Sequence, residues 1–348
     1  MEKVLQGLLD MMLRRGASDL HLVADQPVFL RIHGDLVPVP DTGYTSDDIL
    51  AFIKTSMLSL GEDKFQKFVE TGDADYSYVT PDKLHRFRFN AYKERGNYCL
   101  AIRHIISTPP DYRAIGLPKD VPDVLSVLNG LILVVGPAGS GKTTSLASMV
   151  NWLNENRRLH IITVEEPIEY HHTSKRSLVS QREVGFDTVS FETALKQALR
   201  QDPDVIVIGE IRDYETMKIA ATAAETGHLV LATLHAINAV QALHRIVDLF
   251  PPDQQSQIRS QLASSLRVIY NQRLIPGTTG SRVLAVEVLK QSPQVSNLIR
   301  RGDIHQIGNF LSKTYGSRSM EDALQELLVM GHVDRATVDE VLRELSVN

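Results

Sequence analysis

The sequence contains a single cysteine, Cys99, among its 348 residues. One cysteine excludes a disulfide within the chain and any metal site built from cysteines alone, and it fits a reducing compartment. No apolar stretch approaches the ~20 residues that a membrane-spanning helix needs. The first residues carry Glu2 and Asp10 and lack a long apolar run, which argues against a signal peptide. We therefore expect a cytoplasmic protein with no transmembrane segment.

An excess of positive charge is also lacking. Lysine and arginine together number 37 against 42 acidic residues, for a net charge of −5. Proteins that bind nucleic acid along their length normally need a basic face, so direct nucleic-acid binding is not expected. Hydrophobic residues make up 43% of the chain, which is ordinary for a globular protein. The length predicts two to three domains.

The first 107 residues alternate short apolar runs with polar ones. Residues 2–15 have apolar side chains at helical spacing, and residues 85–89 (HRFRF) alternate arginine and phenylalanine as a strand does. We predict a small α+β domain over residues 1–107. Residues 108–116 follow as a linker, because Pro109 and Pro110 stiffen the chain there.

A different pattern begins at Gly130. Four apolar runs without clean alternation, at 131–135, 160–164, 205–208 and 229–234, are typical of buried parallel strands. Helical stretches separate them, which favours an α/β domain with a mostly parallel sheet over residues 117–290. Within it we expect a helix from about 253 to 270, followed by a hairpin. Residues 291–348 read as a tail of short helices.

The clearest functional motif is a glycine-rich loop between the first of these strands and a helix. Its glycines let backbone N–H groups turn inward around phosphates, and the helix N-terminus adds partial positive charge. The lysine neutralises the β- and γ-phosphates and the following threonine can ligate Mg²⁺. The pattern predicts an ATP and Mg²⁺ site formed by Gly136, Pro137, Ala138, Gly139, Ser140, Gly141, Lys142, Thr143 and Thr144.

Acidic residues follow two other strands of the predicted sheet. Ligands of open parallel sheets bind at the carboxyl ends of the strands, so these acids should lie near the phosphate loop. Glu210 follows the 205–208 strand directly and is predicted to act on the metal side. Glu169 is predicted to polarise the attacking water, because it lies on a loop beyond Pro167. Glu165 and Glu166 are the alternatives for that role.

Two histidines flank the 229–234 strand. A strand of that length separates His228 from His235 by roughly 23 Å, so both cannot touch one phosphate. His235, at the carboxyl end, is the predicted phosphate contact and catalytic residue. His228 is expected to have a structural role or a role in a subunit contact.

These motifs in this order resemble the Walker A, Asp box, Walker B and His box of the secretion and pilus ATPases. The corresponding segments are residues 136–143, 163–170, 199–213 and 226–235. Residues 17–22 (ASDLHL) and 31–35 (RIHGD) are further similar to the PilT-like, type IV pilus retraction branch. The resemblance extends over nearly the whole chain. It implies a RecA-like P-loop domain preceded by a PAS-like α+β domain.

The resemblance also implies a biological role. Family members are ring-shaped homohexamers that hydrolyse ATP at the inner membrane and dismantle pili through a membrane platform protein, which powers twitching motility. Their trans-acting arginines come from a neighbour's N-terminal domain, and the candidates here are Arg86, Arg88 and Arg103. Arg212 is a candidate for coupling the site to a subunit contact or for a salt bridge.

Two positions depart from the family pattern. Glu166 stands where the Asp box usually has aspartate, and Ser296 stands where the C-terminal signature of the retraction branch has arginine. The second change bears on retraction and makes an accessory paralogue a competing interpretation. Two further functions compete with retraction. One is that of a pilus-assembly or type II secretion ATPase, which usually carries a four-cysteine zinc element, and the other is that of a nucleotide-gated regulator.

Overall fold

The computed structural model describes residues 1–32, 34–82, 85–105, 108–311 and 316–347. The chain divides into two compact units, Met1–Ser107 and Thr108–Asn348. The finer division of the second unit at residues 116 and 290 remains a prediction. Within the described parts of the chain, no helix is both long and apolar enough to cross a membrane.

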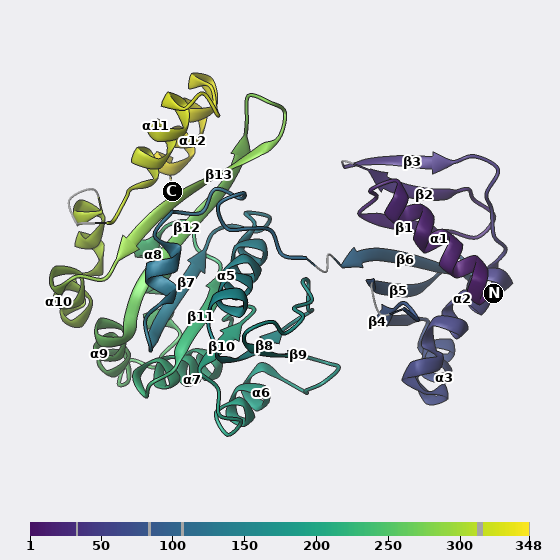
Figure 1. Ribbon diagram of the computed structural model, residues 1–348, viewed down its shortest axis with the longest axis horizontal. Coiled ribbons are helices and arrows are strands. Elements are labelled where there is room, and N and C mark those ends of the chain that lie inside the picture. The colour runs from purple at the N-terminus through teal and green to yellow at the C-terminus, as the bar shows by residue number, and fades with distance from the viewer. Residues whose placement is uncertain (33, 83–84, 106–107, 312–315, 348) are drawn as a thin grey trace. The chain divides into compact units, whose positions relative to one another are not determined.

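The first unit is built on one antiparallel sheet of six strands, in the order β3-β2-β1-β6-β5-β4 (Figure 1). The strands are β1 (Asp19–Leu22), β2 (Val28–Ile32), β3 (Asp35–Val39), β4 (Asp73–Val79), β5 (Arg86–Glu94) and β6 (Asn97–Ile105). The helices are α1 (Glu2–Arg14), α2 (Ser46–Met57) and α3 (Glu62–Thr71), with a 3₁₀ turn, η1, at Leu58–Leu60.

The alternating pattern in β5 explains how this unit forms its core. Phe87 and Phe89 are fully buried and pack in one apolar cluster with side chains of α1 and α2. Arg86 and Arg88 alternate with them and are only half-buried. Successive strand residues point to opposite faces of the sheet, so the arginines lie on the face away from α1 and α2. The predicted strand and its two faces are confirmed.

The second unit contains a seven-stranded sheet in the order β13-β12-β7-β11-β10-β8-β9. All neighbouring pairs are parallel except β12 with β13. This confirms the predicted α/β class with a mostly parallel sheet. The strands are β7 (Gly130–Val135), β8 (His160–Glu165), β9 (Leu178–Glu183), β10 (Val205–Ile208), β11 (Leu229–Leu234), β12 (Leu266–Pro276) and β13 (Arg282–Lys290).

Helices cover both faces of this sheet. On one face the apolar cluster contains side chains of α4 and α5, and also Tyr112 from the predicted linker. On the other face it contains side chains of α6 to α10 and of the 3₁₀ segment η2. These elements are α4 (Val121–Leu125), α5 (Lys142–Asn156), α6 (Phe191–Ala198), α7 (Tyr214–Glu225), α8 (Ala239–Asp248), α9 (Gln255–Ser265), α10 (Pro293–Arg301) and η2 (Ile304–Phe310).

The helix expected from 253 to 270 is wrong in its second half. Helix α9 ends at Ser265, and β12 begins at Leu266 and pairs in parallel with β7. Val268, Ile269 and Tyr270 are all fully buried between the two helical layers. β-Branched and aromatic residues favour a strand in such a place, and pairing with β7 outweighs the helical pattern. The hairpin expected after it is β12–β13.

The helical tail beyond the sheet agrees with the prediction. After α10 and η2, helices α11 (Met320–Val329) and α12 (Arg335–Val347) form a small cluster. Met320, Leu324 and Val338 are buried there against Ile275 and Ala285 of β12 and β13.

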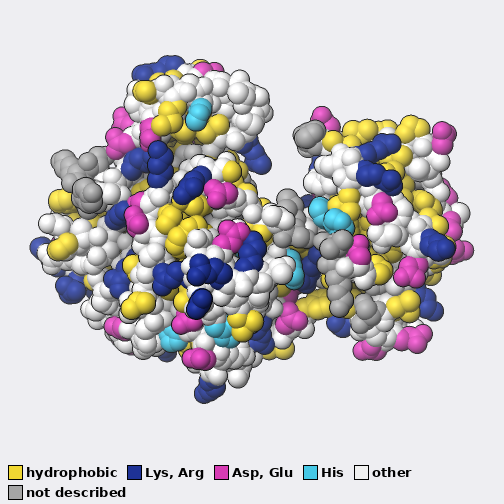
Figure 2. All heavy atoms as spheres, in the orientation of Figure 1, with side chains coloured by type: hydrophobic (Ala, Val, Ile, Leu, Met, Phe, Trp, Pro, Cys, Tyr) yellow, Lys and Arg dark blue, Asp and Glu magenta, His cyan; other side chains and the backbone are white. Residues whose placement is uncertain are grey.

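The surface charges are mixed. Over most of the face that Figure 2 shows, lysine and arginine side chains are interspersed with aspartate and glutamate.

Candidate nucleotide site

The glycine-rich loop joins β7 to α5 in a conformation that only small residues permit. Gly136 has a φ of 153°, and a Cβ added there would lie 2.4 Å from the Gln272 carbonyl oxygen and 2.5 Å from Ser140 Oγ. Gly141 has a φ of 84° and is the N-cap of α5, where no side chain caps the first turn. The N–H groups of this turn are therefore available to an anion, as a phosphate cradle requires.

Lys142 is the first residue of α5, and its side chain folds back onto the loop. Its Nζ donates to the carbonyl oxygens of Gly136 at 3.0 Å and Pro137 at 2.9 Å, and it lies 3.3 Å from His235 Nδ1. Burial lowers the pKa of Lys142, while Glu210 and Glu169 act in the opposite direction.

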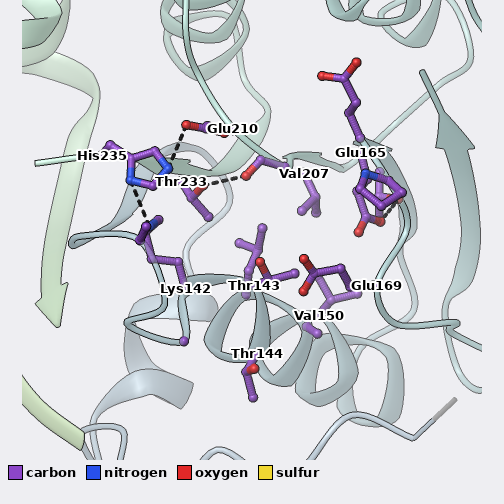
Figure 3. A pocket seen from close by; sticks show the side chains of 18 of the residues that line it. Lys142, Thr143, Thr144, Val150, Glu165, Glu169, Val207, Glu210, Thr233 and His235 are labelled. Atoms are coloured by element: carbon purple, nitrogen blue, oxygen red, sulfur yellow. Dashed lines mark hydrogen bonds and ion pairs between the residues drawn. The ribbon is translucent and has the colours of Figure 1, made fainter. Parts of the chain in front are cut away.

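A cavity of about 430 Å³ lies beside this loop and collects residues from several elements. Figure 3 shows Lys142 and His235 on one side and Glu169 facing Thr143 on the other. Most of the predicted site residues share this cavity. It is lined, among others, by Ala138, Gly139, Gly141, Lys142, Thr143, Thr144, Glu165, Glu166, Glu169, Glu210 and His235.

Four motifs are connected by side-chain contacts at the edge of this cavity. Glu210 Oε1 lies 3.0 Å from His235 Nε2, and Glu210 Oε2 accepts two bonds from Arg212, at 2.8 Å from Nε and 2.7 Å from Nη2. Arg212 Nη1 also reaches Glu166 Oε2 at 3.1 Å. Lys142 in turn contacts His235. Side-chain contacts therefore link the Asp box (Glu166), the Walker B segment (Arg212 and Glu210), the His box (His235) and the phosphate loop (Lys142). For Arg212, the salt-bridge prediction is confirmed.

His235 lies between Glu210 and Lys142, and its surroundings favour the neutral ring. Burial lowers its pKa first, Lys142 lowers it further, and Glu210 partly offsets both. A neutral ring that donates from Nε2 to Glu210 accepts at Nδ1 from Lys142, so one tautomer satisfies both contacts. His228, by contrast, precedes β11 at the other end of the strand, and its Nδ1 lies 3.2 Å from the carbonyl oxygen of Ala223.

The three acids of the Asp box have different surroundings. Glu165 is buried and accepts hydrogen bonds from Thr163 Oγ1 at 2.6 Å and Gln181 Nε2 at 3.1 Å. Burial raises its pKa to about 7. Glu166 is held by Arg212. Glu169 is exposed and lines the cavity, and among the described residues no hydrogen bond or ion pair to its carboxylate is found.

The sequence alone did not indicate the residues that fix the Asp-box loop. Gln181 and Glu183 lie on β9, which pairs in parallel with β8 and carries its polar side chains toward this loop. Tyr170 Oη lies 3.1 Å from Thr144 Oγ1 on α5. Only the pairing of β9 with β8 brings Gln181 here, and nothing in the local sequence marks it.

The residues present suit a magnesium ion bound together with a nucleotide. Among the described residues, no group of three or more histidine, cysteine or acidic side chains could hold a metal by itself. Mg²⁺ beside a nucleotide takes only one or two protein ligands and completes its shell with phosphate oxygens and water. Thr143 and Glu210, which line the same cavity, provide a hydroxyl and a carboxylate of this kind.

The candidate trans-acting arginines all lie on the first unit. Arg88 and Arg103 are directly opposite each other on β5 and β6, and Arg103 is in turn opposite Asp19 on β1. Arg88 is paired with Asp75, and Arg86 Nη2 donates to Ser77 Oγ at 3.3 Å. Arg103 Nε bonds Asp19 Oδ1 at 2.7 Å, while 69% of the Arg103 side chain stays exposed.

Comparisons with known proteins agree with this site. The family model for "Type II/IV secretion system protein" matches residues 1–297. The chain is 38% identical over 335 residues to the "Type IV pilus retractation ATPase PilT" of Pseudomonas aeruginosa, with 96% of each chain covered. It is also 38% identical to the "Type IV pilus ATPase PilU" of that organism, covering 94% of this chain and 85% of the relative.

Solved structures lead to the same group. A crystal structure of the pilus retraction motor PilT with bound ADP superposes with a TM-score of 0.89 at 40% identity, covering 95% of each chain. The match thus covers residues of both units and is to a relative whose structure contains ADP. The chain belongs to the type II/IV secretion system protein family and is similar to the PilT-like pilus retraction ATPases within it.

Proposed function

We propose that this chain is an ATPase that hydrolyses Mg-ATP and powers type IV pilus retraction as a ring-shaped homohexamer. One observation carries the enzymatic part. A single cavity at the carboxyl ends of parallel strands combines the phosphate loop with Glu169, Glu210 and His235. The names of the relatives, which include a pilus retraction ATPase and a pilus retraction motor with bound ADP, support the biological part.

Each residue has a distinct part in this proposal. The N–H groups of the loop and Lys142 bind the phosphates, and Thr143 and Glu210 hold Mg²⁺, which supplies positive charge for the leaving and transferring groups. Glu169 orients and polarises the attacking water. Its carboxylate is exposed and has no partner in the part of the chain that the structure describes, which favours it over Glu165, which is buried, and Glu166, which is held by Arg212. His235 contacts the γ-phosphate once its ring gives up the bond to Glu210 or to Lys142, since both ring nitrogens are occupied in this structure.

The location and partners follow from the same proposal. The motor works in the cytoplasm, peripheral to the inner membrane, on the platform protein of the pilus, and so supports twitching motility. Arg103 is the strongest of the three candidates for acting on a neighbour's nucleotide. Asp19 fixes its Nε, and most of the side chain remains exposed on the sheet surface.

An accessory role beside a second retraction ATPase is the other candidate. Ser296, at the position of the expected signature arginine, is buried on α10, and its Oγ donates to the Ala263 carbonyl oxygen at 2.8 Å. This residue therefore fixes α10 to α9 and presents no charge to a partner. Retraction of pili by this chain alone, in cells that lack their own retraction ATPase, would decide between the two roles.

Phosphate release from ATP tests the enzymatic part. Wild-type protein should release phosphate only with Mg²⁺, and Lys142→Ala should abolish it. Glu169→Gln should keep ATP binding and lose turnover, because it removes only the group that polarises water. Turnover in Lys142→Ala equal to wild type would overturn the proposal. If Glu169→Gln turned over normally while Glu165→Gln did not, the base would be Glu165.

A further inference from the structure

The proposed base, Glu169, has no side-chain partner of its own among the described residues. Its carboxylate can therefore be located only by the backbone of the loop that carries it. Catalysis by a general base requires the carboxylate to stay within hydrogen-bond reach of the water. The groups that hold residues 166–172 in place thus decide where Glu169 lies.

Gln181 holds this loop on both sides of Glu169. Its Nε2 donates to the Tyr170 carbonyl oxygen at 2.9 Å and to Glu165 Oε1 at 3.1 Å. Its Oε1 accepts the His172 backbone N–H at 2.7 Å. One amide thus uses both of its donors and its acceptor, a combination that only a glutamine or asparagine side chain provides.

Two weaker ties support the same loop. Glu183, two residues along β9, accepts the Ile168 N–H on its Oε2 at 3.2 Å. The Tyr170 hydroxyl meets Thr144 Oγ1 on α5, one residue after Thr143. The backbone is therefore fixed at the residue before Glu169, and at the residue directly after it through both main chain and side chain.

We propose that Gln181 is a positioning residue that holds Glu169 over the nucleotide cavity by bonding the loop at Glu165, Tyr170 and His172. This inference rests on the proposed function. Gln181 does not touch the nucleotide in this account, so its loss should lower turnover and leave ATP binding intact. Tyr170 contributes to the same placement from the side of α5.

Gln181→Met and Gln181→Glu separate the contributions of the amide. Methionine keeps the length and removes all three bonds, whereas glutamate keeps the acceptor for His172 and loses both donors. We expect kcat to fall by up to about 100-fold in Gln181→Met, the effect of displacing a reacting group by about 1 Å. The dissociation constant of ATP should not change. Gln197→Met, on the exposed face of α6, is the matched control and should behave as wild type.

A double-mutant cycle distinguishes positioning from general damage to the structure. If Gln181 acts through Glu169, Gln181→Met should cause little further loss of kcat in a Glu169→Gln background, because the group it positions is already gone. Equal losses in both backgrounds would overturn the inference. So would wild-type kcat in Gln181→Met, or a loss of ATP binding that matches the loss of turnover.

Gln181→Glu keeps the test decisive if Gln181→Met does not fold. It loses both donors to the loop, and the fall in kcat should again disappear in the Glu169→Gln background. Additive effects for Gln181→Glu would then overturn the inference. Failure of the proposed function looks different, because wild type would then show no more phosphate release than Lys142→Ala.

Discussion

At the scale of single residues, the Asp box shows how surroundings give three neighbouring carboxylates different tasks. Glu165, Glu166 and Glu169 carry the same side chain within five residues of one another, so the sequence does not distinguish their roles. Burial makes Glu165 easy to protonate, an ion pair fixes Glu166, and Glu169 is exposed, with no hydrogen bond or ion pair to its carboxylate from the described residues. Of the three, only Glu169 suits a water-polarising base, and its proposed role depends on that difference.

Glu165 makes the stability of the protein depend on pH. Its pKa is raised by burial from the usual 4.5 to about 7, so the folded state binds an extra proton between these values. Stability from this group is complete below pH 4.5 and is lost as the pH rises through 7. Glu165→Gln, which keeps the oxygen that Thr163 and Gln181 use, should therefore become more stable than wild type as the pH rises, by about 3 kcal/mol above pH 7.

Urea unfolding of both proteins across this pH range measures the difference. The two unfolding free energies should be close at pH 4.5 and diverge above it. A constant difference at every pH would mean that Glu165 is ionised in the folded protein over the whole range. Glu165 would then again be a candidate for the catalytic base.

At the scale of elements, the phosphate loop depends on β12 as well as on its own sequence. The side chain of Gln272, on β12, donates from Nε2 to the Ser140 backbone carbonyl oxygen at 2.7 Å. The backbone carbonyl oxygen of Gln272 lies against Gly136. Leu274 of the same strand would be 3.4 Å from a Cβ at Gly141. The loop is therefore packed against a strand more than 120 residues away in sequence.

Gly136→Ala should damage nucleotide binding for this reason. The added methyl group would lie within 2.5 Å of two oxygens, at a φ that side chains rarely adopt. Strain of about 1–3 kcal/mol in the phosphate-binding conformation of the loop would weaken ATP binding by roughly five- to 150-fold. Titration with a fluorescent ATP analogue measures the affinity.

Gly7→Ala is the control for Gly136→Ala. Gly7 lies in α1 with no atom within 4 Å of an added Cβ. This change should raise stability by up to about 1 kcal/mol and leave ATP binding as it was. Unchanged ATP binding in Gly136→Ala would show that the loop yields more easily than its packing against β12 suggests.

The elements also show where sequence reasoning succeeds and where it stops. The buried strands β7, β8, β10 and β11 were predicted within a residue because burial on both faces leaves continuous apolar runs. β12 was mistaken in part for a helix, and β9 was not recognised, because pairing with distant strands defines them. Lys142, Glu210 and His235 could be placed at the site from the sequence because each follows directly on a predicted strand or its loop. Gln181 could not, because its position at the site depends on the register of β9 with β8.

At the scale of the whole molecule, the proposed function gives the two units different roles, nucleotide binding for one and the supply of arginines to a neighbouring subunit for the other. The second unit contains the phosphate loop, the acids and His235 in one cavity. The first unit presents Arg86, Arg88 and Arg103 on one face of its sheet. In a ring, arginines from one subunit can stabilise charge at the nucleotide of the next, and hydrolysis then depends on assembly.

The most direct measurement of this central claim is the rate of Mg-dependent ATP hydrolysis per subunit over a wide range of protein concentrations, with Lys142→Ala as the blank. If the active site is shared between subunits, the rate per subunit should rise steeply with concentration and then level off as rings form, while Lys142→Ala stays inactive throughout. A real rate that does not change with concentration, for a protein shown to be monomeric at the lowest concentration, would contradict the shared site. No rate above Lys142→Ala at any concentration would contradict the ATPase itself and favour a nucleotide-gated regulator.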